Sequence, residues 1–160
     1  MRGTLPNPSV TNQVTIRAAI PAERKALEAL QLRASLTNEG DREALLANPD
    51  AIEIPLEQIA GGRVFVSELG GATVGFSAIE PRLDGGIELD ALFVDPHARR
   101  QGIGRLLVEC CAEVARRRGS KALHVIGNPH AEAFYSACGF KQIGTIETRF
   151  GVGLLMRKEL

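Results

Sequence analysis

The first part of the chain changes from strand-like to helical spacing of its apolar residues. Residues 13–18 alternate between apolar and polar side chains, which predicts a first strand. From Pro21 the spacing becomes helical, because proline fits the first turn of a helix and the apolar residues that follow lie three or four positions apart. These residues are Leu27, Leu30 and Ala34, with Leu32 and Leu36 widening the apolar side.

One shorter helix is expected next, followed by an ambiguous segment. Residues 38–41 interrupt the first helix, and Asp41 can cap a second helix that residues 48–50 bring to an end. The segment 51–62 is ambiguous, although Pro55 can start one more helical turn. The N-terminal third of the chain is therefore predicted to be mainly helical after its first strand.

The middle of the chain has the period of strands. Three strand-like segments, 64–68, 73–79 and 87–94, are separated by glycine-containing turns at 70–71 and 83–86. Consecutive strands joined by short turns are typical of an antiparallel meander.

A longer helix is predicted from Gly102 to Gly119. Its last turn carries three arginines, residues 116–118, which could bind nucleic acid. The favoured interpretation is that they offset the negative end of the helix dipole, with Gly119 ending the helix. The apolar positions at helical spacing are Ile103, Leu106, Leu107, Cys110, Cys111 and Val114.

The remaining segments complete a mixed sheet. Residues 122–126 form a short apolar run typical of a buried parallel strand, so strand, helix and strand imply one right-handed crossover. A short helix over 128–137 and two strands, 141–146 and 150–157, are expected to follow. This order predicts an α/β (α+β) fold with helices on both faces of the sheet.

Composition narrows the functional classes. The chain has 160 residues and a formal net charge of +0, so nucleic acid is a poor default partner. It lacks an apolar run long enough for a membrane span, and residues 1–12 lack the apolar core of a secretory signal. We expect a flexible tail over 1–12, a single domain over 13–160 and, from the three cysteines, a reducing cytoplasm.

The stretch 90–105 joins an apolar strand to a glycine-rich turn and a helix start, which together favour an anion site. Gly102-Ile103-Gly104 is a weak motif when taken alone. The dinucleotide pattern G-x-G-x-x-G fails because Leu107 stands at the third glycine position, and no Gly-Lys-Ser/Thr of a phosphate loop occurs. The anion is therefore not bound by either of the usual nucleotide loops.

Two motifs resemble the GNAT superfamily of N-acetyltransferases. Arg99-x-x-Gly102-x-Gly104 follows Leu92-x-Val94-x-Pro96 and is similar to the acetyl-CoA motif of that family. The block from Asn128 to Phe140 resembles its downstream motif. The resemblance implies a central mixed, mostly antiparallel sheet of about seven strands, flanked by about four helices, with a splayed V between the fourth and fifth strands.

The resemblance also implies how acetyl-CoA is held. Backbone N–H groups of 101–105 would bind the pyrophosphate with help from arginine side chains, and the strand that ends at Val94 would pair with the pantetheine arm. Leu92 N–H would polarise the thioester carbonyl. The implied cofactor-binding residues are Leu92, Phe93, Val94, Arg99, Arg100, Gln101, Gly102, Ile103, Gly104, Arg105, Asn128 and Phe134, with no metal.

Two residues are candidates for proton transfer. Tyr135, the only tyrosine, resembles the family's general acid at the coenzyme sulfur, although an amphipathic core aromatic would also fit. Glu88 is the candidate base, directly or through water, with Asp90 or bulk water as alternatives. Cys138 and the three histidines are interpreted as packing or surface residues.

We therefore expect an N-acetyltransferase that transfers an acetyl group from acetyl-CoA to a primary amine by direct attack in a ternary complex. A small-molecule acceptor is favoured over a protein. The resemblance places the acceptor near residues 33–50 and 145–153, whose charges have mixed sign. A non-catalytic acyl-CoA-binding or regulatory module is the alternative. We expect no membrane or nucleic-acid partner, and a homodimer is left open.

Overall fold

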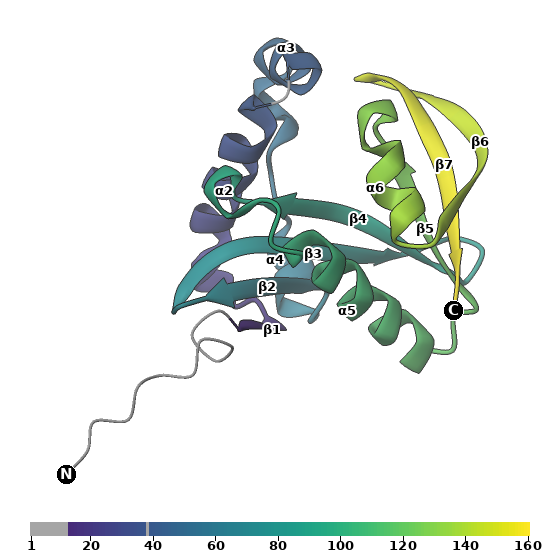
Figure 1. The fold of residues 1–160 in the computed structure, drawn as a ribbon, viewed down its shortest axis with the longest axis horizontal. Coiled ribbons are helices and arrows are strands. Elements are labelled where there is room, and N and C mark those ends of the chain that lie inside the picture. The colour runs from purple at the N-terminus through teal and green to yellow at the C-terminus, as the bar shows by residue number, and fades with distance from the viewer. Residues whose placement is uncertain (1–12, 38) are drawn as a thin grey trace.

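The computed structural model describes residues 13–37 and 39–160, which build one seven-stranded sheet covered by helices (Figure 1). The strand order is β1-β2-β3-β4-β5-β7-β6, and only β4 and β5 run parallel. The mixed, mostly antiparallel sheet is confirmed. The expected tail of residues 1–12 lies outside the described residues. The strands are β1 (Val14–Ala18), β2 (Val64–Leu69), β3 (Ala72–Pro81), β4 (Ile87–Val94), β5 (Ala122–Gly127), β6 (Phe140–Thr148) and β7 (Gly151–Glu159).

Five α-helices are described, against about four expected from the sequence. The additional one is α4, the single turn after Pro55 that the sequence left ambiguous. None of the helices in the described ranges is both long and apolar enough to cross a membrane. The α-helices are α2 (Arg24–Leu36), α3 (Glu39–Ala47), α4 (Leu56–Ala60), α5 (Ile103–Arg117) and α6 (Glu132–Ala137), and short 3-10 turns form η1 (Pro21–Glu23), η2 (Pro49–Ala51), η3 (Pro96–Ala98) and η4 (Pro129–Ala131).

The start of α3 corrects one expectation. Asp41 was expected to cap this helix from outside, but the helix begins at Glu39, so Asp41 lies within its first turn. A carboxylate in the first turn is still stabilised by the positive end of the helix dipole. Asp41 also lines a cavity, which is described below.

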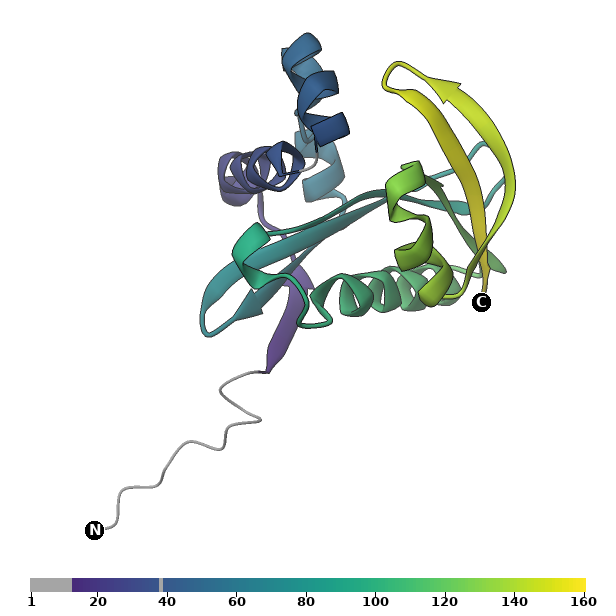
Figure 2. The same ribbon diagram turned by 45° about the horizontal axis from the view of Figure 1, so that its top comes forward.

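Helices cover both faces of the sheet, as expected. Figure 2 shows α2 and α3 on one side of the strands and α5 on the other. On the first side, α2 and α4 bury Leu27, Leu30 and Ile59 against β2 and β3. On the second side, α5 buries Val108 and Cys111 against β3, β4 and β5. Burial of these apolar side chains from water is the main favourable term in the fold.

The parallel pair of strands separates early. Its register runs from Ile87 opposite Leu123 to Leu89 opposite Val125, and no later pair is formed between the described parts of β4 and β5. Beyond that point the two strands diverge (Figure 1). The splayed V expected between the fourth and fifth strands is confirmed.

A β-bulge in β4 lies at the point where the strands separate. Ala78 of β3 pairs with Ala91, whereas the next residue, Ile79, pairs with Leu89, so Asp90 is the additional residue. A bulge bends the strand and changes the direction of the side chains that follow. Asp90 therefore does not follow the simple alternation that begins with Glu88.

Candidate functional site

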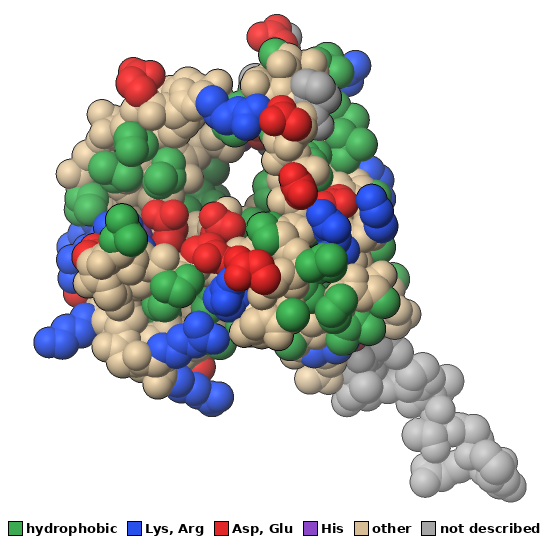
Figure 3. Space-filling model, turned by 180° about the vertical axis from the view of Figure 1, so that it is seen from behind, with side chains coloured by type: hydrophobic (Ala, Val, Ile, Leu, Met, Phe, Trp, Pro, Cys, Tyr) green, Lys and Arg blue, Asp and Glu red, His purple; other side chains and the backbone are tan. Residues whose placement is uncertain are grey.

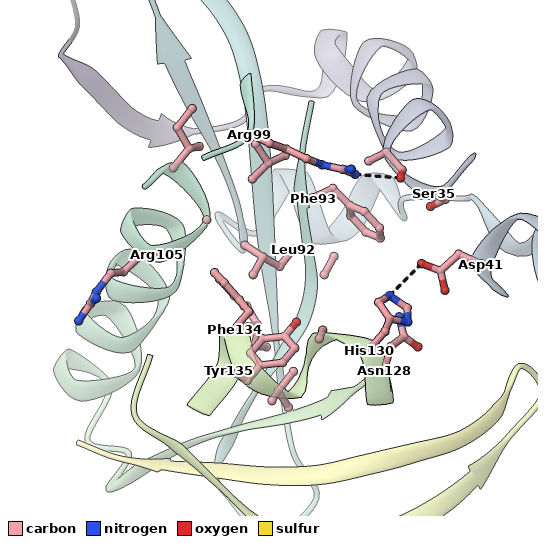
Figure 4. Close-up of a pocket in the computed structure, with 18 of the residues that line it drawn as sticks. Ser35, Asp41, Leu92, Phe93, Arg99, Arg105, Asn128, His130, Phe134 and Tyr135 are labelled. Carbon is pink, nitrogen blue, oxygen red and sulfur yellow. Dashed lines mark hydrogen bonds and ion pairs between the residues drawn. The ribbon is translucent and has the colours of Figure 1, made fainter. Parts of the chain in front are cut away.

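The V between β4 and β5 contains a cavity of about 590 Å³. β4 and the start of α5 form one wall, while β5, η4 and α6 form the other (Figure 4). Of the residues predicted to form the site, all except Gln101 and Glu88 line this cavity. They are Leu92, Phe93, Val94, Arg99, Arg100, Gly102, Ile103, Gly104, Arg105, Asn128, Phe134 and Tyr135.

The β4 wall presents backbone groups to the cavity. Residues 91–94 pair with β3 on one side, whereas the pairing with β5 has already ended at Leu89. Backbone N–H and C=O groups on the open side need another partner when they are buried. An extended ligand with its own amide groups can pair there as an added strand would.

A buried carboxylate shapes the turn after β4. Asp95 accepts hydrogen bonds from the His97 N–H and from the Arg33 guanidinium, at 3.4 and 2.7 Å. Burial by itself would raise the pKa of Asp95, but Arg33 and the His97 N–H lower it below the ordinary value. The ion pair thus joins α2 to the turn that leads into α5.

Two glycines allow a tight turn into α5 and a close approach of α6 to that helix. Gly102 precedes the helix with a φ of 76°, in the left-handed region that favours glycine. A Cβ on Gly104 would lie 3.1 Å from the Phe134 ring, so glycine there lets α6 approach α5. The first N–H groups of α5, which lack intrahelical partners, belong to residues that line the cavity.

The side chains of Arg99 and Arg105, near the start of α5, point in different directions. Arg99 donates to Thr37 Oγ1 at 2.7 Å and to the Ala34 carbonyl at 3.2 Å, both at the end of α2. Figure 4 shows Arg99 lying across the top of the cavity, whereas Arg105 extends away from the other labelled side chains. Arg99 therefore joins the turn before α5 to α2, and it also lines the cavity.

Tyr135 is held among aromatic rings. It packs edge-on against Phe134 and Phe140, with ring centroids 5.2 and 5.5 Å apart. A Cβ on Gly127 would lie 3.1 Å from the tyrosine ring, so a glycine at the end of β5 leaves room for it. The hydroxyl points toward the side of the cavity that carries Leu92 (Figure 4), and burial raises the pKa of Tyr135 to about 12.

The two candidate bases occupy different places. Asp90 lines the cavity and accepts a hydrogen bond from Gln58 Nε2 at 3.1 Å. Glu88 lies outside the lining and pairs with Arg82 at 3.4 Å. Burial raises the pKa of Glu88, and the charges of Asp90 and Asp84 act in the same direction while Arg82 opposes them.

The carboxylates of this region gather on one face. Figure 3 shows acidic side chains beside the opening between the two halves of the molecule. Arg63 pairs with Glu80, and Arg82 pairs with both Asp84 and Glu88. Glu88 is therefore part of a charged cluster next to the cavity.

Asp41 and His130 also line the cavity, and neither was predicted as a catalytic or cofactor-binding residue. His130 Nε2 of η4 lies 3.5 Å from Asp41 Oδ2 of α3, so the pair spans the V from one half to the other (Figure 4). From the sequence alone, His130 is interpreted as a surface or packing histidine. These residues are 89 positions apart, and no local pattern indicates their pairing.

The cysteines are packed rather than exposed to the cavity. Cys111 and Cys138 are buried, and burial raises the pKa of both thiols, that of Cys111 to about 12. A buried thiol with a raised pKa is a poor nucleophile. This agrees with the interpretation of Cys138 as a packing residue.

Comparison with known proteins identifies similar chains. The family model described as "Acetyltransferase (GNAT) domain" matches residues 60–142. An uncharacterized N-acetyltransferase of Methanocaldococcus jannaschii is 33% identical over 87 residues, 49% of this chain and 38% of that protein. The peptidyl-lysine N-acetyltransferase YjaB of Salmonella typhimurium is 40% identical over 62 residues, 39% of this chain and 41% of that protein. The chain thus spans less than half the length of these relatives.

The fold is also found among solved structures. The PaiA N-acetyltransferase of Thermoplasma acidophilum, solved in complex with coenzyme A, superposes with a TM-score of 0.74 at 16% identity. The superposition covers 92% of this chain and 99% of that one. The seven-stranded arrangement is therefore shared over nearly the whole length.

Removal of the Asp95 charge is expected to destabilise the protein in a pH-dependent way. Because folding lowers the pKa of Asp95, its carboxylate stabilises the fold at neutral pH, and this stabilisation is lost as the pH falls through the folded-state pKa. Asp95→Asn should lower the free energy of unfolding at pH 7 by about 1–3 kcal/mol. The difference from the unmodified protein should shrink below about pH 4.

Urea unfolding at pH 7 and pH 3 measures both quantities. Glu53→Gln is the control, because Glu53 forms an exposed ion pair with Arg24 at 3.5 Å that solvent screens. An equal loss of stability for Asp95→Asn at the two pH values would contradict the assigned role of the charge.

Proposed function

Because the chain belongs to the GNAT family of acetyltransferases, whose domain model matches residues 60–142, we propose that it transfers an acetyl group from acetyl-CoA to a primary amine. The observation that carries the proposal is the convergence of three features on one cavity. These are the open side of β4, the start of α5 and the Tyr135 hydroxyl. Each matches a different part of a thioester cofactor.

The cofactor would lie across the V. The N–H groups of 101–105 would bind its pyrophosphate, with Arg99 and Arg100 supplying charge. The pantetheine amides would pair with the open side of residues 92–94, while Asn128 would donate to the arm and Phe134 would pack beside it. The similar PaiA protein was solved with coenzyme A, which supports this choice of ligand.

Acetyl transfer is proposed to be direct. The amine nitrogen attacks the thioester carbonyl carbon, a C–N bond forms, and the C–S bond breaks as coenzyme A leaves. The Leu92 N–H would stabilise the oxyanion of the tetrahedral intermediate. The proton that the amine loses passes to a base or to water, and the departing sulfur needs a proton or a hydrogen bond.

Tyr135 would provide that hydrogen bond to the sulfur. Its pKa of about 12 is higher than the value of about 8.5 for a thiol, so full transfer of its proton to a thiolate is unfavourable. A strong hydrogen bond to the developing thiolate does not require full transfer. We therefore assign Tyr135 mainly to stabilisation of the leaving group.

The base is proposed to be a carboxylate of β4. Burial raises the pKa of Glu88, which is the direction that suits a general base, but Glu88 lies outside the cavity and would act through water. Asp90 lines the cavity directly, although Gln58 occupies one of its oxygens. Bulk water is the third possibility, and the experiment below separates all three.

The alternative is a non-catalytic acyl-CoA-binding module of the same fold. The glycines and arginines at the start of α5 would serve binding alone, whereas a phenol beside the thioester sulfur is needed only for reaction. Tyr135 therefore favours the enzyme. We further propose a small-molecule acceptor and a cytoplasmic location, the latter because Cys110, Cys111 and Cys138 are free thiols.

Gly102→Ala is expected to weaken acetyl-CoA binding. A side chain at a φ of 76° is strained, so the turn would shift and misalign the first N–H groups of α5. We expect a roughly tenfold higher Kd, equivalent to about 1.4 kcal/mol, measured by isothermal titration calorimetry. Gly119→Ala is the matched control, because Gly119 has a φ of 83° just beyond the other end of the same helix.

Both glycine variants should lose similar thermal stability, but only Gly102→Ala should lose affinity for acetyl-CoA. Equal Kd values for the two variants would mean that the start of α5 does not bind the cofactor.

Tyr135→Phe is expected to lower kcat about 100-fold with little change in acetyl-CoA affinity. The ring remains packed between Phe134 and Phe140, while the hydrogen bond to the leaving sulfur is lost. Release of free thiol from acetyl-CoA with a panel of amines measures kcat. An unchanged kcat would remove Tyr135 from the mechanism, and tight cofactor binding without turnover of any amine would favour the binding module.

Glu88→Gln and Asp90→Asn are expected to differ in their pH–rate profiles. A carboxylate base acts only when ionised, so kcat/KM rises as the pH increases through its pKa, which for Glu88 lies above the ordinary value. The variant that lacks the true base should lose this rise of kcat/KM with pH. Its profile should keep only the rise caused by deprotonation of the amine. If both variants retain the rise caused by the carboxylate, the proton goes to bulk water.

A further inference from the structure

A second, smaller cavity opens beside the cofactor cavity. It has a volume of about 160 Å³ and lies between α2, α3, η2, β4 and the β6–β7 turn. Six of the ten residues that line it are apolar, namely Ala44, Leu45, Ala51, Ile52, Phe93 and Phe150. The other four, Gln31, Ser35, Asp41 and Asn128, have polar side chains.

The two cavities are contiguous. Ser35, Asp41, Phe93 and Asn128 line both of them, so the smaller cavity opens toward β4, where the thioester would lie. A molecule that fills the smaller cavity would therefore present one end to the cofactor. This is the arrangement that direct transfer between two bound substrates requires.

An aspartate and a histidine side chain meet where the two cavities join. Asp41 lines both cavities, and its Oδ2 lies 3.5 Å from His130 Nε2, which lines the larger one (Figure 4). A carboxylate at this position favours a cationic group of the ligand over a neutral or anionic one. The end of the smaller cavity at Asp41 thus suits an ammonium group, whereas the apolar remainder of that cavity does not.

The β6–β7 turn closes the far side. Arg149 donates to Asn48 Oδ1 and Asp50 Oδ1 at 2.9 and 3.0 Å, and its Cζ lies 5.0 Å from the centre of the Phe150 ring. Thr148 Oγ1 accepts from the Phe150 N–H at 3.1 Å and orients the turn. Phe150 is held over the cavity by contacts between segments about 100 positions apart in the chain.

The size of the cavity limits what it can hold. An apolar protein cavity of roughly 150 Å³ lined by Leu, Ile and Phe binds benzene. The cavity here has nearly that volume, and the larger apolar side chains of its lining are of the same types, namely Leu45, Ile52, Phe93 and Phe150. Hydroxyl or amide groups placed against these walls would lose their hydrogen bonds to water without replacement.

We propose that this cavity binds the acceptor, and that the acceptor is a small primary amine with an apolar body about the size of a benzene ring. The body fills the space under Phe150, and the nitrogen lies at the Asp41–His130 pair. This inference rests on the proposed acetyltransferase function and specifies its substrate class. It excludes sugars and other polar amines as preferred substrates.

The first test compares amines with the full chain and acetyl-CoA. The probes are 2-phenylethylamine, ethanolamine, a peptide with an N-terminal alanine and an N-terminally blocked peptide with one lysine. We expect kcat/KM for 2-phenylethylamine to exceed each of the others at least tenfold. Faster transfer to ethanolamine or to either peptide overturns this inference and leaves the proposed function intact, whereas absence of transfer to any amine overturns both.

The second test fills the cavity. Ala44→Leu places a larger side chain inside it, whereas Ala47→Leu makes the same change on an exposed position of the same helix. We expect Ala44→Leu to raise KM for 2-phenylethylamine about tenfold while KM for acetyl-CoA stays unchanged. Ala47→Leu should alter neither constant, and equal effects of the two variants overturn the proposal.

A third variant guards against a folding defect in Ala44→Leu. Phe150 is 48% exposed and lies in a turn, so Phe150→Ala opens the cavity without removing a core residue. It should raise KM for 2-phenylethylamine more than KM for ethanolamine. A change of the same size for both amines means that Phe150 does not contact the apolar body, and it overturns the proposed binding mode.

Discussion

The early end of the β4–β5 pairing is the constraint on which the rest of the structure depends. The parallel strands β4 and β5 pair only over Ile87 to Leu89 of β4 and separate beyond these residues. The bulge at Asp90 bends β4 at the point of separation. Separation leaves backbone groups of β4 open and makes room for a cavity within a single sheet. Helix α5 then packs across β3, β4 and β5 and holds the two halves together below the opening.

Polar contacts join α2 to the turn before α5, and others join the two halves of the molecule across the V. Arg33 binds Asp95, and Arg99 binds the last turn of α2, so both arginines join that helix to the segment entering α5. Farther out, Asp41 meets His130, and Arg149 meets Asp50. The helices that line the smaller cavity are thus positioned by the same segments that line the larger one, which links the two cavities physically.

The chemical groups of the site are tuned by their surroundings. Burial raises the pKa of Tyr135 to about 12, which keeps the phenol protonated and able to donate a hydrogen bond. Burial also raises the pKa of Glu88, within a cluster where Arg82 offsets the neighbouring carboxylates. The Tyr135 phenol and the Asp90 carboxylate thus line one cavity, and Glu88 lies outside its lining.

The sequence by itself determined the strands, the crossover and most of the residues that line the cavity at β4 and the start of α5. Those features depend on neighbours within about fifteen residues, such as the spacing of Gly102, Gly104 and the apolar residues of α5. Only the tertiary structure decided that Asp90 rather than Glu88 lines the cavity, because one residue of bulge reverses the alternation. It also brought Asp41 to His130 and Arg149 to Asp50, since contacts between segments 90 to 100 residues apart arise from packing and leave no local pattern.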